Sequence, residues 1–315
     1  MHRPKTARRI VACIALVLGV LLGPAAMAAP MGAHAAATTI TVVDDHRTRV
    51  VLRGVPRRIV ALAPNVVEVL YALGVGNRVV GVSQDSDYPP AAAHKPVVVT
   101  YHDANLEKIV ALRPDLLIAA GIDASYLPKL RSLRLPIIVL DPQTIGGILH
   151  DIAIAGIATG TQGVARALIT RLQARIDAVI RRVRHAVSRP RVYYEYDFDK
   201  AGGWTYGRGS FGDALITMAG GDNVGRAGAG PYPQLSPEQI IGLNPQVIVL
   251  GDAAYGVSPR SVRERPGFDA ILAVQLHHIY PFNDTLVSRP GPRIVTGLEH
   301  LARLLHPEVF PRHAF

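Results

Sequence analysis

The chain has 315 residues, of which 49% are hydrophobic and 18% are charged, and its formal net charge is +10. A composition this apolar excludes a disordered chain, and the length predicts two domains or one large domain. Beyond the first residues the basic side chains are scattered, apart from one cluster in RIDAVIRRVRHAVSRPR. They form no stripe interleaved with aromatics, so solvated surface is favoured over nucleic-acid binding.

The first 28 residues have the pattern of a secretory signal peptide. A basic head precedes the apolar run IVACIALVLGVLL, and small residues follow, with cleavage expected after Ala28 or Ala35. The run is too short to span a bilayer comfortably. The single cysteine, Cys13, lies within it, where IVAC loosely resembles a lipoprotein processing box. We therefore expect residues 1–28 to be removed and the mature, cysteine-free protein to be extracytoplasmic, with a membrane-anchored form as the alternative.

Residues 38–146 are predicted to form a first α/β lobe. The segment 39–52 alternates as a hairpin does, around a polar turn at Asp44–Arg47. Strand patterns then alternate with helix patterns, which predicts a mostly parallel sheet with helices on both faces. In chain order these units are RRIVALAP (strand), NVVEVLYALGVG (helix), RVVGVS (strand), and the helix–strand units NLEKIVALRPDLLIA and SYLPKLRSLRLPIIVLD.

Residues 147–189 are predicted to form a long helix that links two lobes. Uninterrupted from Gln162 to Val187, this helix would be roughly 39 Å long, enough to cross from one domain to another. Glycines at 156, 160 and 163 weaken its first half, where a break is compatible with the pattern. Its apolar stripe, with a recurrence of three or four residues, consists of Val164, Leu168, Leu172, Ile176, Val179 and Val183.

Residues 190–315 repeat the α/β pattern and are predicted to form a second lobe. The glycine-rich stretches AGGWTYGRG and GRAGAGPYP are interpreted as loops. The predicted units are RVYYEY (strand), SFGDALITMAGG (helix), SPEQIIGLNPQVIVL (helix and strand), HHIYPF (strand) and GPRIVTGLEHLARLLHP (terminal helix).

One helix–turn–strand element occurs once in each predicted lobe. NLEKIVALRPDLLIA and SPEQIIGLNPQVIVL match almost position by position at an offset of 131 residues, from Glu107 to Glu238. Asn105 and Ser236 stand at N-cap positions, so each Glu falls in a first helical turn. The helix dipole favours a carboxylate there by about 0.3–1 kcal/mol, which is one explanation of both residues. The other is that a pseudo-symmetric pair of exposed acids suits a two-fold partner with basic pockets.

Six stretches spread over nearly the whole chain after the leader carry a family resemblance. They are RIVALAPNVVEVLYALG, VVGVSQDSDYPP, NLEKIVALRPDLLIA, GSFGDALITMAGGDNV, YPQLSPEQIIGLNPQVIVL and SRPGPRIVTGLEHLARLLHP. Together they resemble the periplasmic substrate-binding proteins of ABC importers for cobalamin, haem and ferric siderophores, most of all the cobalamin-binding members. The resemblance implies two Rossmann-like α/β lobes joined by a long helix, with the ligand cleft between the lobes. It also implies that Glu107 and Glu238 dock the loaded protein onto arginines of two permease subunits.

Aromatic side chains in loops are candidate platforms for a large flat ligand. From the residues alone, the candidates are Tyr88, Tyr101, Trp204, Tyr206 and Tyr232. Trp204 is set among glycines, without an evident helix or strand face to pack on. The resemblance implies cleft positions for Tyr101 and Tyr232, and places Tyr196 and Trp204 near another aromatic cluster.

The resemblance also implies charged ligand residues. Asp284 and Arg289, in NDTLVSRPGPR, match the acidic and basic residues of a ligand-contacting loop. Asp85 and Thr285 stand where the cobalamin binders have aromatics. Cobalamin is the favoured ligand, and haem is an alternative because Tyr101 or His102 could serve as an axial ligand. A ferric siderophore is a further alternative, for which the candidate anion-binding residues are Arg208, Arg289 and Arg293.

No enzyme motif is found in the sequence. GRGSFGD fails the G-x-S-x-G pattern at Arg208, and neither a P-loop nor H-E-x-x-H occurs. His277 and His278 are adjacent in a predicted strand, where they would point to opposite faces and chelate one ion poorly. We therefore predict a monomeric, non-enzymatic binding protein, without a cofactor or a metal site of its own, that delivers a ligand to an ABC permease dimer. A secreted structural or signalling protein is the alternative of another class.

Overall fold

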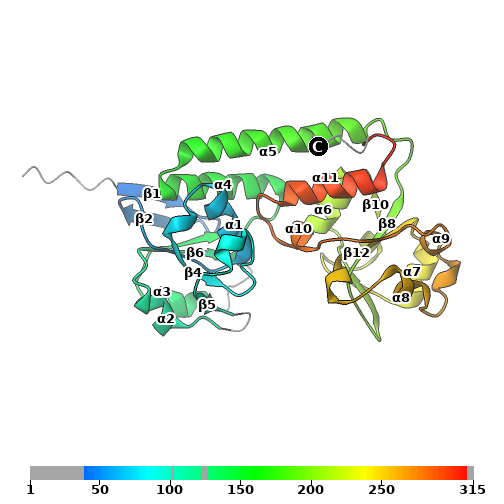
Figure 1. Ribbon diagram of the computed structural model, residues 1–315, viewed down its shortest axis with the longest axis horizontal. Coiled ribbons are helices and arrows are strands. Elements are labelled where there is room, and N and C mark those ends of the chain that lie inside the picture. The colour runs from blue at the N-terminus through cyan, green and yellow to red at the C-terminus, as the bar shows by residue number, and fades with distance from the viewer. Residues whose placement is uncertain (1–38, 101–102, 122–125, 311–315) are drawn as a thin grey trace, which may run out of the picture. The chain divides into compact units, whose positions relative to one another are not determined.

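The computed structural model describes residues 39–100, 103–121 and 126–310 (Figure 1). The predicted signal peptide with Cys13, and the candidate ligand residues Tyr101 and His102, lie outside these described residues. Within the described part of the chain, no helix is long and apolar enough to cross a membrane.

The described chain begins with the predicted hairpin. β1 (Thr39–Val43) pairs antiparallel with β2 (Arg49–Arg53). The buried Asp44 carboxylate accepts hydrogen bonds from the backbone N–H groups of Thr48 at 2.8 Å and Val139 at 3.1 Å. Asp44 therefore closes the turn and also attaches the hairpin to the first sheet.

The first lobe contains a five-stranded sheet in the order β5-β4-β3-β6-β7, and all neighbouring strands are parallel. Side chains alternate between its faces, so that Ile118 packs into one buried cluster and Leu117 into another. The predicted parallel sheet with both faces covered is confirmed. Its elements are β3 (Ile59–Ala61), α1 (Pro64–Ala72), β4 (Val79–Ser83), β5 (Val97–Val99), α2 (Leu106–Ala111), β6 (Leu116–Ala120), α3 (Leu127–Arg131) and β7 (Ile137–Leu140).

Two helices occupy the stretch predicted as one linking helix. α4 (Ile145–Thr159) ends where Gly160 adopts a φ of +72°, a left-handed conformation that glycine takes without strain. α5 (Gln162–Val183) follows and ends four residues earlier than predicted. Its apolar stripe is buried from Leu168 to Val179, whereas Val164 at its start is 48% exposed.

Helix α5 packs along both α4 and α11 (Ile294–Leu305), so both lobes share it (Figure 1). On the α4 side, a side chain at Gly156 would overlap Ala165, which shows how closely these helices approach. On the α11 side, Arg175 donates two hydrogen bonds to Glu299, at 2.6 and 2.7 Å. The first half of α5 is therefore held against α4 by apolar contact, and its second half is held against α11 by an ion pair as well.

The second lobe has a mixed sheet in the order β11-β9-β8-β12-β13, with β10 also paired to β8. β10, β12 and β13 pair in parallel, as predicted for a mostly parallel sheet, but β9 is antiparallel to β8 and β11 and gives the sheet an antiparallel edge. The glycine-rich stretch interpreted as a loop forms β9, because Gly202 and Gly203 pass too close to Leu235 and Tyr193 for a side chain. The strands are β8 (Arg191–Asp199), β9 (Gly202–Thr205), β10 (Asp222–Asn223), β11 (Gln234–Leu235), β12 (Val247–Leu250) and β13 (Ile279–Pro281).

Six helices accompany this sheet. They are α6 (Phe211–Met218), α7 (Pro237–Leu243), α8 (Pro259–Arg263), α9 (Leu272–Gln275), α10 (Thr285–Ser288) and α11. His277 and His278 do not open a strand as predicted. Instead they end α9, because His277 adopts a φ of +59° and both backbone N–H groups bond carbonyls of that helical segment.

The repeated element has the same construction in both lobes. α2 leads to β6 in the first lobe, and α7 leads to β12 in the second. The Asn105 and Ser236 side chains cap these helices as predicted. Both helices also end at a residue with positive φ before proline, Arg113 at +45° and Asn244 at +43°. The repeat therefore includes a shared left-handed turn as well as its apolar pattern.

Candidate functional site

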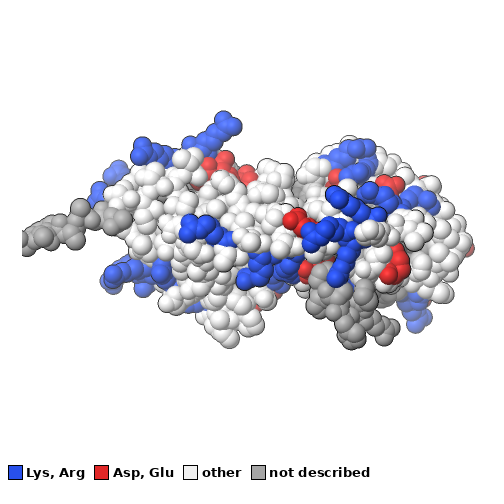
Figure 2. All heavy atoms as spheres, turned by 90° about the horizontal axis from the view of Figure 1, so that it is seen from above, with Lys and Arg blue, Asp and Glu red and all other residues white. Residues whose placement is uncertain are grey.

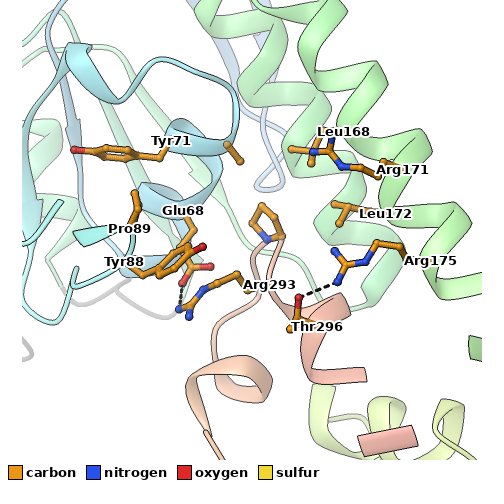
Figure 3. A pocket seen from close by; sticks show the side chains of 12 residues that line it. Glu68, Tyr71, Tyr88, Pro89, Leu168, Arg171, Leu172, Arg175, Arg293 and Thr296 are labelled. Carbon is orange, nitrogen blue, oxygen red and sulfur yellow. Dashed lines mark hydrogen bonds and ion pairs between the residues drawn. The ribbon is translucent and has the colours of Figure 1, made fainter. Parts of the chain in front are cut away.

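The lobes contact each other through residues 289–293, which follow α10. Arg293 Nη2 donates to Glu68 Oε1 of α1 at 2.5 Å (Figure 3). Arg289 Nη1 lies 2.5 Å from Asp87 Oδ1 and 3.9 Å from Glu68 Oε1. The Glu68 side chain is only 2% exposed, and burial raises its pKa although the charge of Arg293 opposes this shift. The contact is thus a largely buried ion network.

A pocket of about 410 Å³ in the second lobe is lined by Tyr196, Tyr206, Tyr232 and Asp284, among other residues. It shares Tyr232 with a smaller pocket of about 70 Å³, whose other lining residues include Asn65 and the ends of β6 and β7 from the first lobe. We call these two adjoining pockets the cleft. The cleft lies at the carboxyl ends of parallel strands, where open α/β sheets bind ligands.

Asp284 organises the aromatic wall of the cleft. Its Oδ1 accepts hydrogen bonds from the Tyr194 and Tyr206 hydroxyls, each at 3.0 Å. The Tyr206 ring centre lies 5.1 Å from that of Tyr196 and 6.1 Å from that of Tyr232. Burial raises the pKa of Tyr206 well above 10 and that of Tyr196 to about 12, so both hydroxyls remain protonated donors. Asp284 Oδ2 receives no donor from the described residues and is available to a ligand.

Besides Arg289, which belongs to the ion network, three predicted ligand residues lie outside the lining of the cleft. Trp204 lies on β9, and its side chain hydrogen-bonds Asp199, so its interpretation as a loop residue is wrong. Tyr88 is covered by Arg293, whose guanidinium carbon is 3.9 Å from the ring centre. Asp85, with a φ of +60°, lines a separate surface pocket. None of these three therefore forms the aromatic wall.

The structure brings Tyr196, Tyr232 and Asp284 together, with Tyr206 at their centre. Sequence reasoning missed Tyr194, the second donor to Asp284, and Phe211, which lines both pockets of the cleft. The alternation in RVYYEY could have indicated Tyr194, because residues two apart on a strand share a face and Tyr196 was already a candidate.

Glu107 and Glu238 both lie exposed in the first turn of their helices. Ser236 Oγ donates to Glu238 at 2.8 Å, and this bond, together with the backbone N–H of Glu238, lowers the pKa of that carboxyl. Glu238 is therefore held ionised and oriented. Within the described residues no group of three or more His, Cys, Asp or Glu is arranged to hold a metal ion.

Comparison with known families identifies the fold. A family model described as periplasmic binding protein matches residues 59–285, which include both sheets. The chain belongs to the periplasmic binding protein family. This confirms the resemblance drawn from the six sequence stretches, and solved structures of family members share the two-lobed architecture.

Among curated relatives, the chain is 30% identical to a cobalamin-binding protein of Halobacterium salinarum, over 97% of this chain and 86% of the relative. It is 29% identical to an ABC transporter substrate-binding lipoprotein of Bacillus subtilis, over 86% of this chain and 87% of the relative. Among solved structures, it matches the vitamin B12 binding protein BtuF of Vibrio cholerae with a TM-score of 0.70 and 28% identity, over 82% of this chain and 99% of that one. The haem-binding protein RhuT of Roseiflexus gives a TM-score of 0.73 and 26% identity, over 80% and 99%.

Proposed function

We propose that the protein is an extracytoplasmic solute-binding protein that captures a large metal-chelate ligand, cobalamin first, and delivers it to an ABC permease. The observation that carries this proposal is the aromatic wall of Tyr196, Tyr206 and Tyr232 around Asp284, at the junction of two lobes. Such rings offer flat apolar platforms, and Asp284 Oδ2 offers an acceptor for amide N–H groups. The cobalamin-binding relatives support this choice of ligand.

Haem is the second candidate ligand, because the structural match to the haem-binding RhuT is as good as that to BtuF. In that case Tyr101 or His102 would supply the axial ligand to iron. A ferric siderophore has less support, since two of its three candidate arginines, Arg289 and Arg293, already pair with first-lobe carboxylates.

For the permease, we propose that Glu107 and Glu238 are the docking residues. Both are exposed, both follow an N-cap and each belongs to one copy of the repeated element. A pair of carboxylates, one on each lobe, matches a partner with two similar basic pockets. The predicted leader and the substrate-binding lipoprotein relative support an extracytoplasmic location, either free or anchored.

The ligand is tested by titrating the mature protein with cyanocobalamin, haemin and ferric siderophores while melting temperature and Trp204 fluorescence are measured. Saturating cobalamin should raise the melting temperature, because a ligand that binds only the folded state stabilises it. Asp284→Asn should weaken cobalamin binding. No shift with cobalamin, together with a Soret change with haemin, would favour the haem assignment instead.

The docking residues are tested separately from the ligand. Glu107→Ala combined with Glu238→Ala should leave cobalamin affinity unchanged and abolish uptake in cells. Glu264→Ala is the matched control, because Glu264 is also exposed on the second lobe and pairs only with Arg260. Reduced ligand affinity in the double variant would show that these residues do not belong to the partner surface.

A further inference from the structure

A second pocket, of about 370 Å³, lies outside the cleft (Figure 3). It is formed by the second half of α1, the Tyr88–Pro89 segment, the middle of α5 and the start of α11. It shares no lining residue with either pocket of the cleft. Its volume falls within the range of small-molecule sites in proteins.

The charges that line this pocket do not balance. Arg293 pairs with the buried Glu68, and Arg175 pairs with Glu299 through two hydrogen bonds. Arg171 has no hydrogen bond or ion pair with the described residues, although it lines the same pocket. In Figure 3, Arg171 and Arg175 extend from α5 toward the pocket. One positive charge is therefore left uncompensated, and Glu68 contributes little opposing charge because Arg293 neutralises it.

Some guanidinium N–H donors in the pocket also have no hydrogen-bond acceptor among the described residues. Arg175 engages Nε and Nη2, and Arg293 engages Nη2 only, so the Nη1 groups of both are unpaired within the described residues. Guanidinium N–H groups bind carboxylate oxygens in pairs, which is the strongest form of such hydrogen bonds. The pocket thus presents three guanidinium groups, and their unused N–H donors could form hydrogen bonds to an oxyanion.

Apart from Thr296, whose hydroxyl oxygen accepts a hydrogen bond from Arg175, the remaining lining is apolar or aromatic. Leu168 and Leu172 line it from α5, Tyr71 and Ala72 from α1, and Tyr88, Pro89 and Pro292 from the adjoining segments (Figure 3). Such a wall has no means of binding a bare inorganic ion but would cover the apolar body of an organic one.

We propose that this pocket binds a small organic monoanion, in which a flat apolar body carries one carboxylate. The carboxylate lies among Arg171, Arg175 and Arg293, and the body lies between Tyr71 and Leu172. Because first-lobe, second-lobe and α5 residues all line the pocket, the anion contacts both lobes and the helix that they share. The proposal is independent of the cleft ligand.

The test uses three probes on the mature protein, with calorimetry and melting temperature as measurements. 1-Naphthoate carries both features, 1-naphthalenemethanol has the same body without the charge, and inorganic phosphate has charge without the body. We expect saturable binding of 1-naphthoate, at least about tenfold tighter than either other probe. Equal affinity for 1-naphthoate and the neutral probe, or for 1-naphthoate and phosphate, would overturn the proposal.

Variants then place the site. Arg171→Gln should weaken 1-naphthoate binding about tenfold, whereas Arg166→Gln, another exposed arginine on α5 that does not line the pocket, should leave it unchanged. Ala72→Leu should narrow the pocket and weaken binding of the probe. Equal losses in the two arginine variants would show non-specific attraction. Displacement of 1-naphthoate by cobalamin would place the probe in the cleft. Equal losses in the arginine variants and displacement by cobalamin would each contradict the proposal.

Discussion

Asp252 follows β12 and is only 4% exposed, yet neither of its carboxylate oxygens has a hydrogen-bond partner among the residues that the structure describes. It lies beside Glu195, which Arg265 already neutralises through two hydrogen bonds of 2.6 and 2.7 Å. Burial is the largest cause, and the charge of Glu195 the second, of a rise in the pKa of Asp252 to about 7. The ionised form is therefore disfavoured in the folded protein but not in the unfolded chain.

This raised pKa predicts that stability falls as pH rises. The stabilising effect of the protonated form is fully present below the unfolded pKa of 3.8 and is lost as pH rises through about 7, at a cost of roughly 4 kcal/mol. Asp252→Asn should remove the part of the fall that Asp252 causes and make the protein more stable than wild type at pH 8, while the buried Asp151, whose pKa burial raises to about 9, keeps a fall of its own. Urea denaturation at pH 4 to 8 measures the effect. The exposed Asp269 provides the control Asp269→Asn, and an unchanged fall in Asp252→Asn would contradict the assignment.

At the residue scale, the sequence predicted which residues line the cleft better than it predicted the hydrogen bonds between them. Tyr196, Tyr232 and Asp284 were candidates and lie together. The hydrogen bonds of Asp284 to Tyr194 and Tyr206 were not predictable, because they join residues 90 and 78 positions away in the chain. Trp204 was misplaced because its glycine neighbours were taken as loop residues, whereas they permit close strand pairing.

At the scale of elements, the close approach of α4 and α5 depends on Gly156. Gly156→Ala should destabilise the protein by about 1–3 kcal/mol, because the new methyl group overlaps Ala165, even though alanine favours helix by about 1 kcal/mol. Gly163→Ala in α5 is the matched control, since no heavy atom lies within 4 Å of the added carbon, and it should stabilise by up to about 1 kcal/mol. Chemical denaturation measures both, and stabilisation by Gly156→Ala would contradict this account of the packing.

Periodicity identified most elements of both sheets, because buried parallel strands and amphipathic helices have distinct apolar patterns. It did not identify β9 or the mixed edge of the second sheet, where glycine replaces apolar residues. The break at Gly160 was compatible with the pattern, but only the structure shows that the helices fold back on each other. Element type was thus predictable, and the long-range packing of elements was not.

At the scale of the whole molecule, Arg289 has two roles that compete. It is a candidate ligand residue, but without ligand it pairs with Asp87 of the other lobe. Asp87→Asn should therefore raise cobalamin affinity about two- to fivefold, because Arg289 then has only the more distant Glu68 to leave, and the ion pair with the exposed Asp87 contributes up to about 1 kcal/mol. Calorimetry measures the change.

The control is Asp103→Asn, which removes another exposed ion pair of the first lobe, with Lys129, far along the chain from Arg289. It should leave affinity unchanged. A loss of affinity in Asp87→Asn would mean that Asp87 itself contacts the ligand, and that the ion pair is not a competitor.

The two-lobed architecture was predictable because the repeated element appears once in each half of the chain, and the family match agrees with it. The ion network between the lobes was not, since Glu68 and Arg293 are 225 residues apart. On the face that α5 presents, lysines and arginines are spread with few acidic side chains among them (Figure 2). On this face the basic side chains are therefore dispersed, in line with their scatter along the sequence.

Helix α5 also has a consequence for the order in which the protein is made. Its first half can pack on α4 as soon as both have been synthesised, but Arg175 must wait for Glu299, 124 residues later. Until α11 emerges, the apolar stripe around Ile176 and Val179 lacks part of its cover. A chain that is still being synthesised therefore leaves part of the apolar stripe of α5 uncovered, and exposed apolar surface of this kind is prone to aggregation and is what chaperones bind.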